Sequence, residues 1–268
     1  MGNITIVTAF FDIGRGDWSS DKGLPGYLQR TTDTYMERFG YLAELDNQII
    51  VYTSKDQVQK VLELRKGKED KTKIISVAFE DLFPVHREKI ERIQKDVNYL
   101  KQINPNQIRN PEYWSVDYVL VNLLKSHFVN DAIKNGYVDN DLVAWIDFGY
   151  CRDKETLNGV KSWSYPFNPD KIHFFDFRQY LGQPINYIIS NNLVHMFGAK
   201  IVAGKSKWES LQELICGAFN NLTAANLVDD DQTLMLLAYL YNPEIFELHR
   251  IDESDPFVMF RNFNETTS

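Results

Sequence analysis

The chain has 268 residues, of which 44% are hydrophobic and 25% are charged, and its formal net charge at pH 7 is −8. These proportions exclude a disordered chain, and the length predicts a single α/β domain over residues 1–268. The negative charge argues against nucleic acid as a partner, because nonspecific binding depends on Lys and Arg side chains that neutralise phosphates.

No segment that would direct the chain to a membrane or out of the cell is recognisable. No apolar run approaches the roughly 20 residues that span a bilayer, and residues 1–13 lack a basic start followed by an apolar stretch. Cys151 and Cys216 are far apart and have no second pair, which argues against disulfide and cysteine-zinc frameworks. The expected location is the cytoplasm.

Apolar runs and stretches of helical spacing alternate along the chain. In chain order they predict a strand over 4–11, a helix over 27–45, a strand over 48–53, a helix over 56–65, a strand over 73–77, helices over 84–101 and 112–135, strands over 142–146, 173–177 and 199–203, and helices over 208–219 and 231–241. This order predicts an α/β fold with a mostly parallel sheet and a C-terminal helical elaboration. Its ligands should bind outside the carboxyl ends of the strands.

Asp147 follows the strand predicted over 142–146 directly, and Gly149 comes two residues later. A carboxylate at a strand end can bind a divalent cation that bridges two phosphates, and a glycine lets another group approach closely. A carboxylate that orders the following turn is the alternative explanation of Asp147. Both interpretations stay open at this point.

The loop after the first strand, Asp12 to Trp18, contains an arginine between two glycines. Free backbone amides and the guanidinium of Arg15 suit phosphate oxygens, although the loop matches neither a P-loop nor the dinucleotide fingerprint. A surface turn with one solvated arginine is the alternative.

Three consecutive aspartates, Asp229 to Asp231, precede the helix predicted over 231–241. A carboxylate at a helix N-terminus accepts backbone N–H groups, so an N-cap explains at least one of them. Another of the three is a candidate base or acceptor-binding group.

The other candidates are basic and imidazole side chains, with one thiol. Lys125 and Arg152 are candidates for contacts to phosphate, and His249 is a candidate metal ligand or pyrophosphate contact. Packing roles are expected for the three that remain, His127, His173 and Cys151.

Three segments of unusual wording carry a resemblance to a known family. They are Val7-Thr8-Ala9-Phe10-Phe11-Asp12-Ile13-Gly14-Arg15-Gly16, Tyr113-Trp114-Ser115-Val116-Asp117-Tyr118 with Lys125, and Trp145-Ile146-Asp147-Phe148-Gly149-Tyr150-Cys151-Arg152. Together they resemble the HtrL/YibB family over most of the chain. Members of that family occur in bacterial lipopolysaccharide and capsule gene clusters. The family is similar to GT-A glycosyltransferases, and some members are implicated in galactofuranosyl transfer.

The resemblance implies a GT-A-like, Rossmann-type fold and a glycosyltransferase. The enzyme would move galactofuranose or another hexose from a nucleotide-sugar donor, with UDP as the expected nucleotide, to a glycan or lipid-linked glycan acceptor. Peripheral contact with the inner face of the plasma membrane is compatible with such an acceptor. The donor would contact eight residues, namely Thr8, Phe10, Arg15, Lys125, Asp147, Phe148, Gly149 and Arg152.

The resemblance also implies a metal site and a base. Asp147 would occupy the place of the metal-binding Asp-x-Asp motif, in which Gly149 replaces the second Asp. Mn²⁺ or Mg²⁺ is therefore expected on Asp147 with His249 as a further ligand, and neutralisation of the diphosphate by cationic side chains is the alternative. In an inverting reaction Asp230 or Asp231 would take the proton of the acceptor hydroxyl.

Two other functions compete with this one. A sugar nucleotidyltransferase shares the architecture, but a glycine-rich phosphate loop of its type does not follow the first strand. A noncatalytic sugar-binding protein of a polysaccharide assembly would explain the loss of the second Asp.

Overall fold

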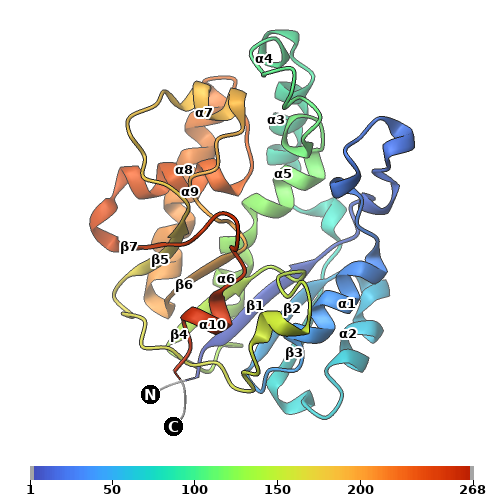
Figure 1. The fold of residues 1–268 in the computed structure, drawn as a ribbon, viewed down its shortest axis with the longest axis vertical. Coiled ribbons are helices and arrows are strands. Elements are labelled where there is room, and N and C mark those ends of the chain that lie inside the picture. Colours follow the sequence, from blue (N-terminus) through green and yellow to red (C-terminus); the bar gives the residue numbers. More distant parts are fainter. Residues whose placement is uncertain (1–2, 266–268) are drawn as a thin grey trace.

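The computed structural model describes residues 3–265 and places seven strands in one mixed sheet (Figure 1). The order across the sheet is β3-β2-β1-β4-β6-β5-β7. The strands are β1 (Thr5–Phe10), β2 (Ile49–Thr53), β3 (Thr72–Ser76), β4 (Leu142–Ile146), β5 (Ile172–Asp176), β6 (Lys200–Gly204) and β7 (Phe246–Arg250). The first four strands are mutually parallel, β6 is antiparallel to both of its neighbours, and β7 is parallel to β5.

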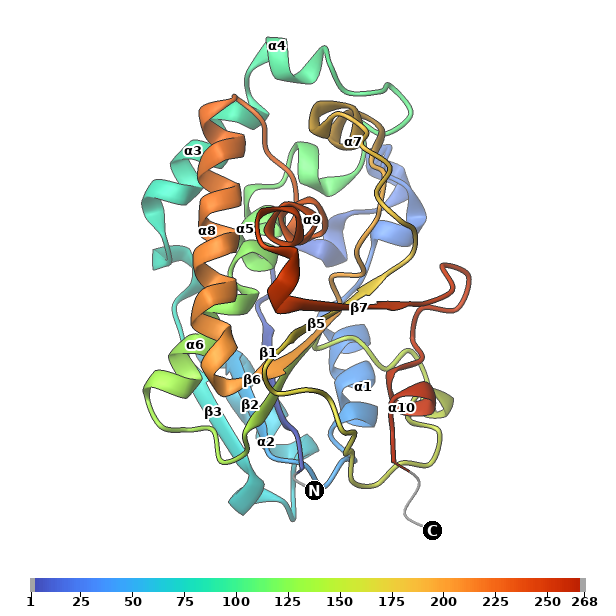
Figure 2. The same cartoon turned by 90° about the vertical axis from the view of Figure 1, so that its left-hand side faces the viewer.

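Helices cover both faces of the sheet, as Figure 2 shows from the side. They are α1 (Thr32–Leu42), α2 (Val58–Leu64), α3 (Pro84–Gln94), α4 (Val97–Leu100), α5 (Val116–Leu123), α6 (Lys125–Lys134), α7 (Ile185–Asn191), α8 (Trp208–Ala224), α9 (Asp231–Tyr241) and α10 (Met259–Asn262). One apolar core joins the sheet to α3, α5, α6, α8 and α9, and a second core joins the opposite face to α1, α2 and α10. Within residues 3–265, no helix has both the length and the apolarity required to cross a bilayer.

The strand order creates a crevice between β1 and β4. The chain builds β1, β2 and β3 toward one edge of the sheet and then returns to place β4 on the other side of β1. In open α/β sheets, the connections that follow the two strands at such a reversal lead apart and leave a gap at their carboxyl ends, where ligands bind. The segments after Phe10 and Ile146 both start at this gap.

The structure confirms the α/β fold, the mostly parallel sheet and every strand that the sequence predicts. It corrects two long helices. The helix predicted over 84–101 is broken at Asp96, whose side chain accepts the backbone N–H of Asn98 at 2.8 Å and starts a new helix. The helix predicted over 112–135 starts only at Val116 and is interrupted at Leu124, where ψ is 0°. Three short elements were missed: α7, β7 and α10.

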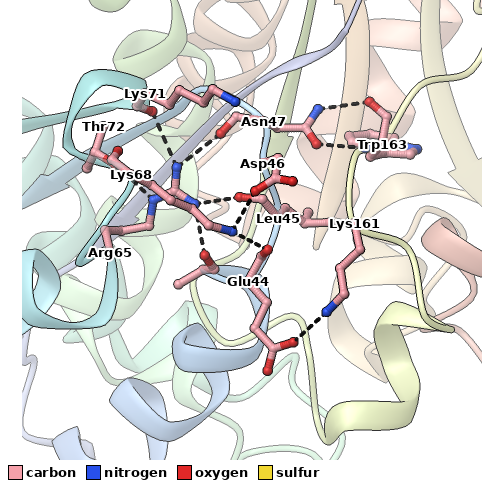
Figure 3. Close-up of polar contacts among 11 residues, drawn as sticks. Glu44, Leu45, Asp46, Asn47, Arg65, Lys68, Lys71, Thr72, Lys161 and Trp163 are labelled. Carbon is pink, nitrogen blue, oxygen red and sulfur yellow. Dashed lines mark hydrogen bonds and ion pairs between the residues drawn. The ribbon is translucent and has the colours of Figure 1, made fainter.

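A buried arginine holds the base of the parallel half of the sheet together (Figure 3). Arg65 follows α2, is 1% exposed, and donates to the backbone oxygens of Ala43 at 2.9 Å, Leu45 at 2.6 Å and Asn47 at 3.1 Å. Its Nε also donates to Thr72 Oγ1, at the start of β3, at 2.8 Å. Burial lowers the pKa of Arg65 to about 10, so the side chain stays charged at neutral pH. The loop between α1 and β2 is therefore held by one guanidinium, whose N–H donors lie in one plane at fixed angles.

Candidate functional site

A cleft of about 160 Å³ opens at the carboxyl ends of β1 and β4. Its walls come from the loop after β1, the start of α1, the facing sides of α5 and α6, and the turn after β4. The lining residues are Ala9, Phe10, Phe11, Asp12, Ile13, Arg15, Arg30, Thr32, Tyr35, Tyr118, Val121, Asn122, Lys125, Trp145, Asp147, Phe148, Gly149, Tyr150, Arg152 and Ala199.

Cationic groups outnumber carboxylates in this lining. It contains Arg15, Arg30, Lys125 and Arg152, against Asp12 and Asp147. Both oxygens of Asp12 are already occupied, since Oδ1 accepts the Gly14 N–H at 2.9 Å and Oδ2 accepts the Thr32 hydroxyl at 2.6 Å. The cleft therefore carries an excess of positive charge although the whole chain is negative.

Arg30 and Arg152 line one wall of the cleft, and Arg38 is close enough for its charge to act on Arg152. Burial, and then the charges of Arg30 and Arg38, lower the pKa of Arg152 to about 10. Burial and the charge of Arg30 likewise lower the pKa of Arg38, whose Nη1 is buried without a hydrogen-bond partner. None of the three forms an ion pair with a carboxylate of residues 3–265. Like charges held together at a cost are typical of a site whose partner is an anionic ligand.

Arg15 is fixed by the loop and by α1. Its Nη1 donates to the Tyr35 hydroxyl at 2.7 Å, its Nη2 donates to the Leu28 carbonyl at 3.1 Å, and the guanidinium lies 5.1 Å from the centre of the Trp18 ring. Gly14 precedes it at φ 79°, a left-handed conformation that glycine adopts without strain. The loop is a tight turn, and Arg15 is held in place by Tyr35 and the Leu28 carbonyl.

Lys125 joins two carboxylates at the floor of the cleft. Its buried ammonium lies 3.0 Å from Asp147 Oδ1 and 2.7 Å from Asp231 Oδ2, and it donates to the Gly198 carbonyl at 2.9 Å. Burial opposes the charge of Lys125, but Asp147 and Asp231 together raise its pKa above the ordinary value. The lysine therefore stays protonated, and its single charge is shared between the two carboxylates.

Asp147 is oriented by its neighbours on β4 and α6. The turn after β4 is closed by backbone, because Tyr150 N–H donates to the Asp147 carbonyl at 2.8 Å. The side chain instead accepts Trp145 Nε1–H at 2.7 Å and the Lys125 ammonium, both at Oδ1. Within the described part of the chain no hydrogen bond is formed to Oδ2, so this oxygen is available to a ligand. The side chain is 37% exposed.

The aspartates before α9 are buried behind Lys125 and do not line the cleft. Asp230 is the N-cap of α9, accepting the Gln232 N–H at 3.0 Å, and Asp229 accepts the Thr233 hydroxyl at 2.5 Å. Burial raises the pKa of Asp230 well above its ordinary value, and the nearby carboxyls of Asp231, Asp229 and Glu112 raise it further. The prediction of an N-cap is thereby confirmed for Asp230. Asp231 contacts Lys125, which in turn contacts Asp147 in the cleft.

The other residues predicted to contact the nucleotide sugar differ in whether they line the cleft. Phe10 and Phe148 stack at a centroid distance of 5.0 Å and form part of its lining. Gly149 lies against Tyr35, and a Cβ there would sit 3.0 Å from a ring carbon, so a larger residue would fit only if the Tyr35 ring shifted. Thr8 is buried within β1 and is absent from the lining.

His249 does not reach Asp147, which corrects the expected pairing of these two residues on one metal. His249 lies on β7, and β6 and β5 separate that strand from β4. Three strand spacings amount to roughly 14 Å. Its ring also stacks on Phe175 in the second core, whereas Asp147 faces Lys125 on α6.

A resident Mn²⁺ or Mg²⁺ fits the cleft poorly. These ions need several oxygen ligands. Asp147 Oδ2 is the one carboxylate oxygen of the lining that no hydrogen bond or ion pair of residues 3–265 occupies, and the surrounding side chains are positive. The arrangement is suited instead to binding an anion directly.

Sequence reasoning missed Arg30, which lines the cleft, and Arg38, whose charge acts on Arg152. Arg30 and Arg38 lie just before and within α1, where an isolated arginine is usually solvated, and their spacing carries no motif. Tyr35 and Tyr118 were also missed, although Tyr118 stands inside one of the segments that carry the family resemblance. A helical-wheel comparison would have placed Arg38 one turn after Tyr35 on the same face of α1.

Comparison with known proteins identifies the family of this chain. A family described as a bacterial protein of unknown function (HtrL_YibB) matches residues 2–264. Protein HtrL of Escherichia coli (strain K12) is 40% identical over 268 residues, covering 98% of this chain and 93% of that protein. The chain belongs to the HtrL/YibB family. The crystal structure of mouse xyloside xylosyltransferase 1 in its apo form has a TM-score of 0.41 and 10% identity, over 92% of this chain and 85% of that one.

Removal of the Lys125 ammonium from this HtrL/YibB protein should leave the buried Asp231 and the partly exposed Asp147 without their shared cation. We expect Lys125→Met to lower the free energy of unfolding by about 3 kcal/mol at neutral pH. Without the lysine the pKa of Asp231 rises further, so the folded state holds a proton that the unfolded state releases. The deficit should therefore shrink toward pH 5 and grow toward about pH 8.

Urea unfolding at both pH values measures this effect. The double variant Lys125→Met/Asp231→Asn should recover part of the loss, because the second buried charge is gone. Lys134→Met is the matched control in the same helix, since its pair with Glu209 at 2.9 Å is more than half exposed and should contribute little. Equal losses for Lys125→Met and Lys134→Met would contradict this assignment.

Proposed function

We propose that this protein is a glycosyltransferase that takes a sugar from a nucleotide-diphosphate donor bound in the cationic cleft. The observation that carries the proposal is the wall of unpaired arginines at the strand reversal between β1 and β4. A diphosphate supplies several charged oxygens in a small volume, and guanidinium groups bind such oxygens in a bidentate manner. We further propose UDP as the nucleotide and a surface-polysaccharide glycan, free or lipid-linked, as the acceptor.

The arginines would act on the leaving group. When the bond between the anomeric carbon and the diphosphate oxygen breaks, negative charge develops on that oxygen. Fixed cations stabilise this charge more strongly in the transition state than in the bound donor, and this difference lowers the barrier. Arg15, Arg30 and Arg152 line the cleft and are candidates for this role.

A carboxylate must also take the proton of the acceptor hydroxyl as the new glycosidic bond forms in an inverting reaction. We assign this role to Asp147 in preference to Asp230 and Asp231, which are absent from the lining. Trp145 and Lys125 hold Asp147 Oδ1, so Oδ2 is the oxygen that would accept the proton. Asp231 would then keep Lys125 in position.

A groove beside the cleft would receive the acceptor. It is lined by Ile13, Trp18, Arg87, Glu91, Trp114, Ser115, Val116 and Asp117, and Ile13 belongs to the cleft as well. Trp114 is 37% exposed and meets Trp18 edge to face at 4.8 Å. An aromatic surface bordered by charged side chains suits a sugar ring, which has apolar faces and a rim of hydroxyls.

Arg152→Gln should weaken binding of the correct nucleotide diphosphate roughly 30-fold, corresponding to about 2 kcal/mol for one charge-assisted phosphate contact. Stability should change little, because within residues 3–265 the Arg152 side chain forms no hydrogen bond or ion pair and lies 4.5 Å from the Phe257 ring. Arg92→Gln, on an exposed face of α3, is the control.

A thermal-shift panel of UDP, GDP, CDP, ADP and their sugar conjugates identifies the ligand. The correct one, at about 100 times its dissociation constant, should add roughly 2.7 kcal/mol. Arms with and without Mn²⁺ or Mg²⁺ test the divalent ion first expected on Asp147. If no nucleotide shifts the melting temperature, the noncatalytic sugar-binding alternative gains support.

Asp147→Asn should retain donor binding and lose turnover, because the amide keeps the shape of the side chain but cannot accept the acceptor proton. The loss should be about 10²-fold or more, the usual contribution of a general base. Nucleotide release from the sugar conjugate found in the panel measures the rate. Turnover at the wild-type rate would remove Asp147 from the reaction, and lost binding would place it in donor recognition.

Trp114→Ala should separate acceptor from donor recognition. Retention of bacterial surface glycans on an array should fall by about tenfold, as expected for the loss of one aromatic contact worth about 1.4 kcal/mol. The nucleotide-induced thermal shift should stay unchanged. Tyr187→Ala, which removes an aromatic ring 51% exposed on α7, is the control, and an equal effect of both variants would contradict an acceptor site in the groove.

A further inference from the structure

A second group of ligating side chains lies on the opposite face of the sheet from Lys125. His173 on β5 and Glu247 and His249 on β7 bring one ligand atom each within 4.8 Å of one another. His173 Nδ1 is 2.9 Å from His249 Nε2, and each nitrogen is 3.8 Å from a Glu247 oxygen. The group is independent of the cleft and of the reaction proposed there.

The convergence follows from strand register. His173 pairs with Glu247, and Phe175 pairs with His249, in the parallel ladder of β5 and β7. Side chains two residues apart on a strand share a face, so Glu247 and His249 both stand beside His173. Phe246 and Leu248 alternate with them and pack into the other core.

The hydrogen bond of His173 Nε2 determines whether His173 Nδ1 carries a proton. His173 Nε2 is 2.9 Å from the Asn168 carbonyl, an acceptor only, so this nitrogen carries the proton. Nδ1 therefore presents a lone pair toward His249 and Glu247. A carbonyl that fixes the tautomer and the ring orientation of a histidine is the usual outer support of a metal ligand.

We propose that His173, Glu247 and His249 form a zinc site. Two neutral imidazoles and one carboxylate are the ligand types that Zn²⁺ selects, with one position left for water. Tetrahedral angles at ordinary Zn–N distances require the two nitrogens to separate by roughly 0.4 Å more than they do here. His173 is 1% exposed while Glu247 is about half exposed, so the ion would enter from the Glu247 side.

The ion would tie the edge strand β7 to β5. His249 and His173 already form one side of an aromatic cluster, in which His249 lies 5.2 Å from both Phe175 and Phe263. A metal shared by the two strands would hold the last strand of the sheet and the segment that follows it in place. Its expected effect is therefore on stability.

The experiment uses the whole protein stripped of metal with a chelator and titrated with Co²⁺ alone. Tetrahedral Co²⁺ absorbs visible light strongly, and we expect these bands to saturate at one ion per chain and to vanish when Zn²⁺ is added. Zn²⁺ should also raise the melting temperature. No visible bands, or no rise with Zn²⁺, would overturn the proposal and leave an ordinary hydrogen bond between two histidines.

Variants assign the site to these residues. His249→Gln should abolish the Co²⁺ bands. Glu247→Gln, at a half-exposed position that does not disturb the core, should weaken Zn²⁺ binding about tenfold or more, because one of three ligands is lost. His86→Gln on α3, outside the cluster, is the control. Undiminished binding by Glu247→Gln, or equal loss in His86→Gln, would contradict the assignment. The nucleotide panel is unaffected by either result.

Discussion

The Lys125 ammonium is the interaction on which the candidate site depends. It joins the end of β4, the start of α9 and the segment before β6, which come from distant parts of the sequence. Each of its charged partners is costly to bury alone, and the shared ammonium offsets part of that cost. The position of Asp147 at the floor of the cleft is therefore set by its ion pair with Lys125 as well as by the strand that carries it.

This arrangement leaves Arg30 and Arg152 on the other wall without an ion pair to any carboxylate of residues 3–265. Asp147 and Asp231 are paired with Lys125. Both oxygens of Asp12 accept hydrogen bonds, from the Gly14 N–H and the Thr32 hydroxyl. The pKa of Arg152 is lowered by burial and then by its cationic neighbours, so its charged form is held at a cost that an anion would relieve. The cleft thus separates a floor, where two carboxylates share the Lys125 ammonium, from a positive wall. A ligand that bridges them would carry negative charge at one end and a polar, uncharged group at the other.

Local sequence patterns predicted most of the fold because the strands are continuous apolar runs and the parallel sheet buries them on both faces. They did not predict strand order, and this caused the main error at the site. The antiparallel strand β6 and its partner β5 stand between β4 and β7, so His249 cannot share a metal with Asp147. Arg15, Lys125, Asp147 and Arg152 were found because they stand next to strand ends or within a family segment. Arg30 lines the same cleft and Arg38 acts on Arg152 from α1, and only the packing of that helix brings them there.

Because the net charge of the chain is −8, binding of an anionic ligand depends on the positive charges placed in the cleft. At physiological ionic strength, exposed charges are largely screened beyond about 8 Å, so most of the acidic surface contributes little inside the cleft. The arginines act within this range, in a partly desolvated site where their attraction is stronger than in water. A compact dianion would gain from several of them at once, whereas a single carboxylate would gain from one or two. The same geometry that makes the empty wall costly therefore favours ligands with dense negative charge, such as a diphosphate, over the many singly charged anions of a cell.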